Sequence, residues 1–137
     1  MKTVFTVGVY DLIHFGHVEL FRKARALGDR LVVAVQDSDW ITRFKPDSPA
    51  VNSTEMRMYM VGAIRYVDEV ISYKDVASIV KQVPFDIFVA GGDQKHSGFL
   101  EAIEWCKAHG KTVVRLPRTE GISTSELKEH IRSANKA

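Results

Sequence analysis

The chain has 137 residues, 45% of them apolar and 26% charged, a composition typical of one folded domain and not of a disordered chain. Lysine and arginine number 19 against 17 acidic residues, so a net charge of +2 gives no reason to expect nucleic-acid or membrane partners. A single cysteine, Cys106, excludes an internal disulfide and a multi-cysteine zinc site. We recognise no secretion signal or membrane-length apolar run, and expect a single cytoplasmic domain over residues 1–137.

Five apolar runs of strand length alternate along the chain with segments of helical periodicity. Runs rich in valine, isoleucine and phenylalanine suit a parallel sheet that is covered on both faces. The predicted strands are 3–8, 31–35, 69–72, 86–90 and 112–116. Helices are predicted over 17–27, from 53 or 54 to 64, over 75–83 and 99–109, and after the capping box Ser123-x-x-Glu126. This order predicts a three-layer α/β fold whose ligands bind beyond the carboxyl ends of the strands.

Two polar segments are predicted to be loops. Residues 36–52 contain Pro46 and Pro49 and show weak periodicity, and residues 91–98 are rich in glycine. Each follows the carboxyl end of a predicted strand. Because long loops in compact domains are more often functional than incidental, both are expected to border the site.

The segment from Gly8 to His17 leaves the first predicted strand and enters the first helix. Gly8 allows a tight turn, Gly16 allows a phosphate to approach the main chain, and a helix N-terminus attracts anions. His14 and His17 lie one turn apart there, and each can donate to phosphate oxygens. An incidental surface pair and two ligands of a zinc site are the alternatives, although no third zinc ligand is apparent.

A second anion-binding motif, residues 118–125, follows the fifth strand. It combines the guanidinium of Arg118 with several hydroxyl groups, a glycine and another helix N-terminus. A capped helix with an exposed arginine is the alternative interpretation. Two such motifs, each at a strand-to-helix turn, are less easily explained by chance than one.

Together the two motifs resemble the nucleotidyltransferase superfamily with the His-x-Gly-His signature. The similarity is greatest to the cytidylyltransferase branch, and within it to the glycerol-3-phosphate cytidylyltransferases. It extends over nearly the whole chain and includes residues 27–35, 65–71 and 116–124. The Arg-Thr-x-Gly-Ile-Ser-Thr motif is the more specific of the two because it marks the cytidylyl branch. The resemblance implies a Rossmann-like nucleotidyltransferase fold.

The resemblance also implies a reaction, in which CTP and a phosphorylated alcohol give a CDP-alcohol and pyrophosphate. The attacking phosphate monoester is already anionic and needs no general base. It must instead be placed in line with the α-phosphorus while the leaving pyrophosphate is neutralised. Mg²⁺ bound with the nucleotide phosphates would assist, and no protein metal site is implied.

Site residues follow from the resemblance. His14 and His17 would contact the α- and β-phosphates, and Arg118 the β- and γ-phosphates. Lys45, or Arg43 in its place, would lie beside the reacting phosphates, and Arg57 would point into the site toward the substrate. Asp11 would hold the loop or a metal-bound water, with an Asx turn as the alternative. The remaining nucleotide-binding predictions are Gly8, Val9, Tyr10, Gly16, Asp93, Thr119, Gly121, Ser123 and Thr124.

Segments 36–39, 40–52 and 94–98 depart from the glycerol-3-phosphate pattern, so the acceptor stays open. An adenylyltransferase that acts on a sugar phosphate with ATP is the main alternative, because such enzymes share the His-x-Gly-His and Gly-Gly-Asp segments. A phosphate-binding domain without catalysis is a third reading. The resemblance places residues 65–68 near a subunit contact and therefore implies a homodimer.

Overall fold

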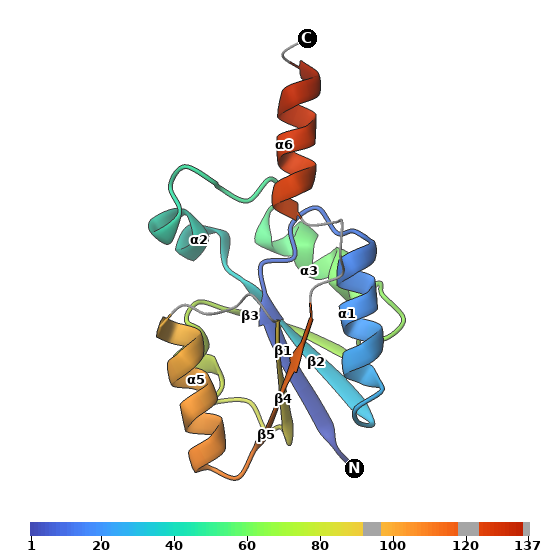
Figure 1. Cartoon of the computed structure of the whole chain (residues 1–137), viewed down its shortest axis with the longest axis vertical. Coiled ribbons are helices and arrows are strands. Elements are labelled where there is room, and N and C mark those ends of the chain that lie inside the picture. Colours follow the sequence, from blue (N-terminus) through green and yellow to red (C-terminus); the bar gives the residue numbers. More distant parts are fainter. Residues whose placement is uncertain (92–96, 118–123, 136–137) are drawn as a thin grey trace.

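In the computed structural model, which describes residues 1–91, 97–117 and 124–135, five parallel strands form one sheet in the order β3-β2-β1-β4-β5 (Figure 1). The strands are β1 (Thr3–Gly8), β2 (Arg30–Gln36), β3 (Glu69–Tyr73), β4 (Ile87–Gly91) and β5 (Thr112–Leu116). The predicted Rossmann-like α/β fold with a five-stranded parallel sheet is confirmed. Because the chain passes from one half of the sheet to the other between β3 and β4, the strand order reverses beside β1, where such folds bind ligands.

Six helices are described, and each expected helix is among them. They are α1 (Phe15–Arg25), α2 (Ser38–Phe44), α3 (Thr54–Gly62), α4 (Val76–Ile79), α5 (Ser97–Ala108) and α6 (Thr124–Asn135). Helix α4 is shorter than predicted, although hydrogen-bonded turns continue from it to Val83, directly before Pro84. Of the helices in the described part of the chain, none is long and apolar enough to cross a membrane.

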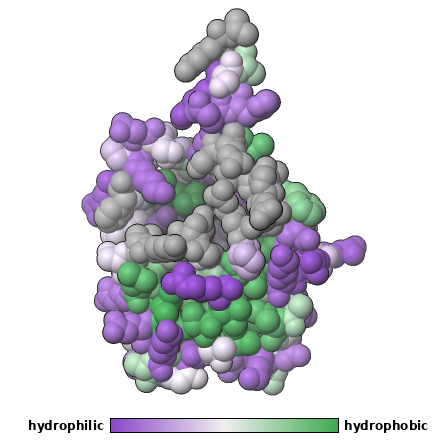
Figure 2. All heavy atoms as spheres, in the orientation of Figure 1, coloured by the Kyte–Doolittle hydropathy of each residue, from purple (hydrophilic) through white to green (hydrophobic). Residues whose placement is uncertain are grey.

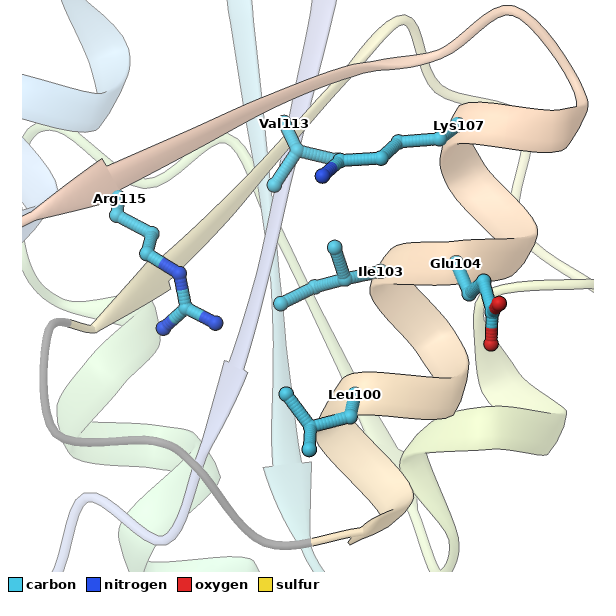
Figure 3. A pocket seen from close by; sticks show the side chains of 6 residues that line it. All are labelled: Leu100, Ile103, Glu104, Lys107, Val113 and Arg115. Carbon is cyan, nitrogen blue, oxygen red and sulfur yellow. The ribbon is translucent and has the colours of Figure 1, made fainter.

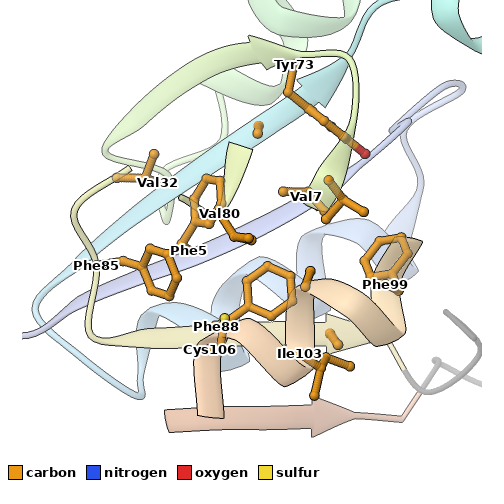
Figure 4. Packing of buried hydrophobic residues seen from close by; sticks show 14 residues of the cluster. Phe5, Val7, Val32, Tyr73, Val80, Phe85, Phe88, Phe99, Ile103 and Cys106 are labelled. Atoms are coloured by element: carbon orange, nitrogen blue, oxygen red, sulfur yellow. The ribbon is translucent and has the colours of Figure 1, made fainter. Parts of the chain in front are cut away.

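The sheet separates two hydrophobic clusters, because successive side chains of a strand point to opposite faces. Phe5 and Val7 of β1 pack on the α5 side with Phe85, Phe88 and Phe99 (Figure 4). The alternate residues of β1 and β2 pack on the other side against α1 and α3; these are Val4, Leu31, Val33 and Val35, with Phe21, Ala24 and Val61. Burial on both faces explains why the strands show continuous apolar runs and no alternation.

Helix α2 was missed by the prediction of a loop over 36–52. Asp37 caps this helix by accepting from the amide of Asp39, and Ile41 is its buried apolar anchor. Arg43 stacks on Trp40, with its guanidinium carbon 5.2 Å from the ring centre. A helix of seven residues spans only about two turns, which is too short for a periodic apolar stripe, so hydrophobic patterning does not detect it.

Helices α2 and α6 lie at the end of the molecule where the strands have their carboxyl ends, and α1 begins there (Figure 1). Helix α6 projects away from the sheet along the long axis. The elements that carry both predicted anion-binding motifs are thus gathered at the edge of the sheet where ligands of this fold bind.

Candidate functional site

The loop between β1 and α1 has an unusual backbone. Tyr10 and Leu12 have φ angles of +54° and +49°, in the left-handed region that residues with a Cβ rarely adopt. The ring of Tyr10 lies over Gly8, so closely that a Cβ at position 8 would come within 2.7 Å of Tyr10 Cζ. Gly8 is therefore required by ring packing. Strain of this kind concentrates at functional sites, where the surrounding structure maintains it.

His14 and His17 cap the start of α1 through their own side chains. Nδ1 of His14 accepts from the amide of Gly16 at 3.0 Å, and Nδ1 of His17 accepts from the amide of His14 at 3.2 Å. The two rings stack with centroids 3.9 Å apart. The expectation that the helix start would offer its amides freely to a phosphate is corrected in part, because the amides of Gly16 and His14 already have ring acceptors. With each Nδ1 accepting, a neutral imidazole carries its proton on Nε2.

His17 is held neutral at physiological pH. Burial, reinforced by the neighbouring His14 and opposed by the charge of Asp11, lowers the pKa of His17 to about 4. The edge of the Tyr10 ring packs against the His17 ring, with centroids 5.6 Å apart at 84°. His17 is therefore oriented by packing and by its capping bond, and its neutral ring carries the proton on Nε2.

Asp11 is a buried carboxylate that holds the loop before α3. It is 1% exposed, and its oxygens accept from the amides of Val51 at 2.6 Å and Asn52 at 3.0 Å. Its third partner is Lys128 of α6, at 3.2 Å. Burial alone would raise the pKa of Asp11, but these amides and the ammonium group outweigh it and lower the pKa. Of the roles predicted for Asp11, the structure displays loop fixation.

Arg57 of α3 is fully buried, and its five N–H groups all have protein acceptors. Nε donates to the carbonyl of Asn52 at 3.0 Å, and Nη1 donates to the carbonyls of Val9 and Gln36, each at 2.8 Å. Nη2 donates to the hydroxyls of Ser38 at 2.7 Å and Thr54 at 3.4 Å. Arg57 therefore joins the carboxyl ends of β1 and β2 to the starts of α2 and α3. In this arrangement it has no donor left for a substrate.

The structure describes some of the remaining predicted site residues but not others. Lys45 is exposed at the end of α2, where its amide donates to Ile41. Thr124 is the first residue of α6. Asp93, Arg118, Thr119, Gly121 and Ser123 lie outside the described residues. The structure thus brings together the residues of the first motif, Arg57 and the loop before α3.

A groove lies between α5 and β5 (Figure 3). Leu100, Ile103 and Val113 form its apolar part, and Glu104, Lys107 and Arg115 border it. In Figure 2 apolar side chains gather over this region of the surface. Of the predicted site residues that the structure describes, none lines the groove.

Several polar residues at the site were not predicted. Asn52, Ser38, Thr54 and Lys128 bond to Arg57 or Asp11, as described above. Ser38 and Thr54 directly follow Asp37 and Ser53, the residues that cap α2 and α3. Hydroxyl residues are common at helix starts, so their presence there does not by itself predict a functional site. No sequence pattern indicates a buried partner for Lys128, because a lysine in a polar terminal helix is usually solvent-exposed.

Comparison with known proteins identifies the class. Residues 5–130 match the model of the family described as cytidylyltransferase-like. The chain belongs to this family of nucleotidyltransferases.

Its relatives include glycerol-3-phosphate cytidylyltransferase of Bacillus subtilis, 40% identical over 135 residues that cover 96% of this chain and 98% of the relative. The bifunctional protein HldE of Pseudomonas fluorescens is 38% identical over 99% of this chain, but the chain spans only 29% of its length. Among solved structures, the lipopolysaccharide core biosynthesis protein of Thermoplasma volcanium superposes with a TM-score of 0.70 at 27% identity, over 87% of this chain and 97% of that one.

Replacing Arg57 with lysine should destabilise the protein by at least about 2 kcal/mol. An ammonium group has three donors and no planar fork, so buried carbonyls among Val9, Gln36 and Asn52 lose their donor, and each such loss costs about 1–3 kcal/mol. Urea unfolding of Arg57→Lys measures the loss. Arg22→Lys is the control, because Arg22 is an exposed partner of Glu19. Equal stability of the two variants would contradict the assignment.

The free energy of unfolding should depend on His17 between pH 6.5 and 4. The folded-state pKa of His17 lies below its unfolded value. In this window the unfolded chain therefore binds a proton at His17 that the folded protein does not bind, and the free energy of unfolding falls as the pH falls. The loss is on the order of 2–3 kcal/mol. Urea unfolding at several pH values should show a shallower slope for His17→Asn than for the wild type. An unchanged slope in His17→Asn, with the surface variant His109→Asn as reference, would exclude this role.

Proposed function

We propose that the chain transfers a cytidylyl group from MgCTP to a small phosphorylated alcohol or polyol, with glycerol 3-phosphate as the favoured acceptor. A phosphate oxygen of the acceptor attacks the α-phosphorus of CTP, and the bond from that phosphorus to the bridging oxygen breaks. A CDP-alcohol and pyrophosphate are the products. The observation that carries the proposal is the stacked, tautomer-fixed pair of His14 and His17 at the switch point of the sheet. The full-length match to a glycerol-3-phosphate cytidylyltransferase supports the choice of nucleotide and acceptor.

The two histidines would act as fixed hydrogen-bond donors. Their Nδ1 atoms accept from backbone amides, so each ring would donate its Nε2–H to a phosphate oxygen. Donors that need no reorganisation stabilise the charge that develops on the phosphates as the transition state forms. Neither ring is needed as a base, because the attacking phosphate is already ionised.

Positive charge would come from other residues. We assign Lys45, on the exposed end of α2, to the reacting phosphates, with Arg43 as the alternative, and Arg118 to the β- and γ-phosphates. Thr119, Gly121, Ser123 and Thr124 would complete the second anion site, and Asp93 would accept a hydrogen bond from the amino group of cytosine. Arg57 is reassigned from substrate contact to positioning, because its donors hold the ends of β1 and β2.

Mg²⁺ would enter as part of the nucleotide substrate. Asp11 is the carboxylate of the first motif, but its oxygens accept from two amides and Lys128, so it is poorly suited to bind a metal directly. Within residues 1–91, 97–117 and 124–135 no three His, Cys, Asp or Glu side chains cluster closely enough to hold a metal ion. Mg²⁺ commonly retains several waters and binds mainly through substrate phosphates.

Pyrophosphate release from purified protein tests the function. CTP and ATP are each offered with glycerol 3-phosphate, other phosphorylated polyols and sugar phosphates. The proposal expects the highest kcat/KM with CTP and a phosphorylated alcohol. Faster turnover with ATP and a sugar phosphate would replace it with adenylyl transfer, and binding of nucleotide without pyrophosphate release would indicate a non-catalytic domain.

His14→Ala and His17→Ala should each lower kcat by about 10²–10³-fold, the usual effect of removing one transition-state donor. His109→Ala is the control, because His109 stacks on Trp105 at the far end of α5. The variants are compared at saturating CTP after circular dichroism has verified folding. Turnover near the wild-type value in either site variant would refute its role.

A homodimer that uses residues 65–68 is the proposed assembly. This segment leads into β3, which is an edge strand of the sheet. Asp68 is bound within the chain to Arg25 at 3.0 Å and to the amide of Leu31 at 2.7 Å, whereas the Arg65 side chain is exposed. A two-fold contact through Arg65 would form twice. Sedimentation at micromolar concentration should give a dimer that Arg65→Ala weakens, and a fully active monomer of 15.4 kDa would eliminate the assembly.

A further inference from the structure

Helix α6 is joined to the body of the protein through Lys128. The helix projects from the end of the molecule (Figure 1), yet the Lys128 side chain is only 17% exposed. Its ammonium group lies 3.2 Å from a carboxylate oxygen of Asp11 and 3.5 Å from the carbonyl oxygen of Pro49. Lys128 therefore links α6 to the histidine loop and, 79 positions back along the chain, to the loop before α3.

The Asp11–Lys128 pair differs in kind from a surface ion pair. Asp11 is 1% exposed, so removing Lys128 would take away a cation that lies 3.2 Å from a buried carboxylate. On the same helix, Arg132 and Glu129 are 4.0 Å apart, with side chains 60% and 67% exposed, and such a pair contributes little. Helix α6 thus carries one buried and one exposed ion pair, which provides a matched comparison.

The position of Lys128 gives the pair a consequence for the site. Thr124, the first residue of α6, precedes Lys128 by four residues, which is about one helical turn. Fixing Lys128 therefore fixes the N-terminus of α6 relative to the loop that carries His14 and His17. Lys128 also neutralises the carboxylate of that loop, which would otherwise repel an anionic substrate.

We propose that Lys128 is a positioning residue, which locks the start of α6 against the histidine loop and the 49–52 loop through the buried charge of Asp11. Its kinetic consequence rests on the proposed nucleotidyl transfer, whereas its structural consequence does not. Lys128 contacts no substrate in this assignment. Its loss should weaken the binding of the nucleotide more than it slows the chemical step.

The structural test compares Lys128→Met, Lys128→Arg and the control Arg132→Met by hydrogen–deuterium exchange of the full chain, without substrate. Lys128→Met should speed exchange at the amides of Val51 and Asn52 and in the first turns of α6 by about tenfold or more, which corresponds to about 1.4 kcal/mol. Lys128→Arg should restore most of the protection, and Arg132→Met should leave the 49–52 loop unchanged. Unchanged exchange of both segments in Lys128→Met would overturn the proposal, whether or not the protein is a cytidylyltransferase.

The kinetic test uses the same three variants with CTP and the best acceptor. Lys128→Met should raise KM for CTP roughly 10- to 100-fold, equivalent to about 1.4–2.7 kcal/mol of binding, and change kcat by less than about threefold. Lys128→Arg should recover most of the affinity. Faster exchange in Lys128→Met with unaltered KM would overturn the positioning role, and so would a fall in kcat alone. If the wild type releases no pyrophosphate with any pair, the proposed function fails, and Lys128 is then judged by exchange alone.

Discussion

The guanidinium of Arg57 is the contact on which the geometry of the site depends. A parallel sheet leaves the carbonyls at its carboxyl end without partners where the strands stop, and buried carbonyls need donors. Arg57 supplies them for Val9 and Gln36, just beyond β1 and at the end of β2, and for Asn52 in the loop before α3. Burial lowers the pKa of Arg57, although nearby Asp11 and Asp37 oppose the shift, and the group stays charged because its starting pKa is so high. A lysine in the same place would have neither the number of donors nor their planar spread.

Residues 51–52 are therefore fixed by hydrogen bonds to both Asp11 and Arg57. Asp11 accepts their amides, and Arg57 donates to the carbonyl of Asn52. A segment bound by one buried anion and one buried cation can hardly move without exposing a charge to an apolar surrounding. The loop that begins with the exposed Lys45 thus has a rigid end at Asn52 and a solvent-facing end at α2.

The sequence was most informative where one physical factor decides the structure. The apolar runs placed the strands within one or two residues, because burial on both faces leaves no alternative for a stretch such as residues 31–35. The sequence predicts a tight turn at Gly8, but it does not predict that the Tyr10 ring excludes a Cβ there, because this contact depends on the folded loop. Arg57 was predicted to contact the substrate, but whether its donors face substrate or backbone depends on contacts with Val9 and Gln36, which are 48 and 21 positions away. Lys128 was not found, because its partner Asp11 lies at the other end of the chain.

The protonation of His17 has a consequence for how the work of the site is divided. A pKa of about 4 means that this ring carries no charge at neutral pH. Burial is the main cause, and the nearby His14, whose ring centroid lies 3.9 Å away, lowers the pKa further. In the proposed transfer, His17 therefore contributes a directional hydrogen bond and no charge that would offset the repulsion between a triphosphate and a phosphorylated acceptor. In the proposed transfer that task falls to other cations, and the exposed Lys45 at the end of α2 has the freedom for it that the fully engaged Arg57 lacks.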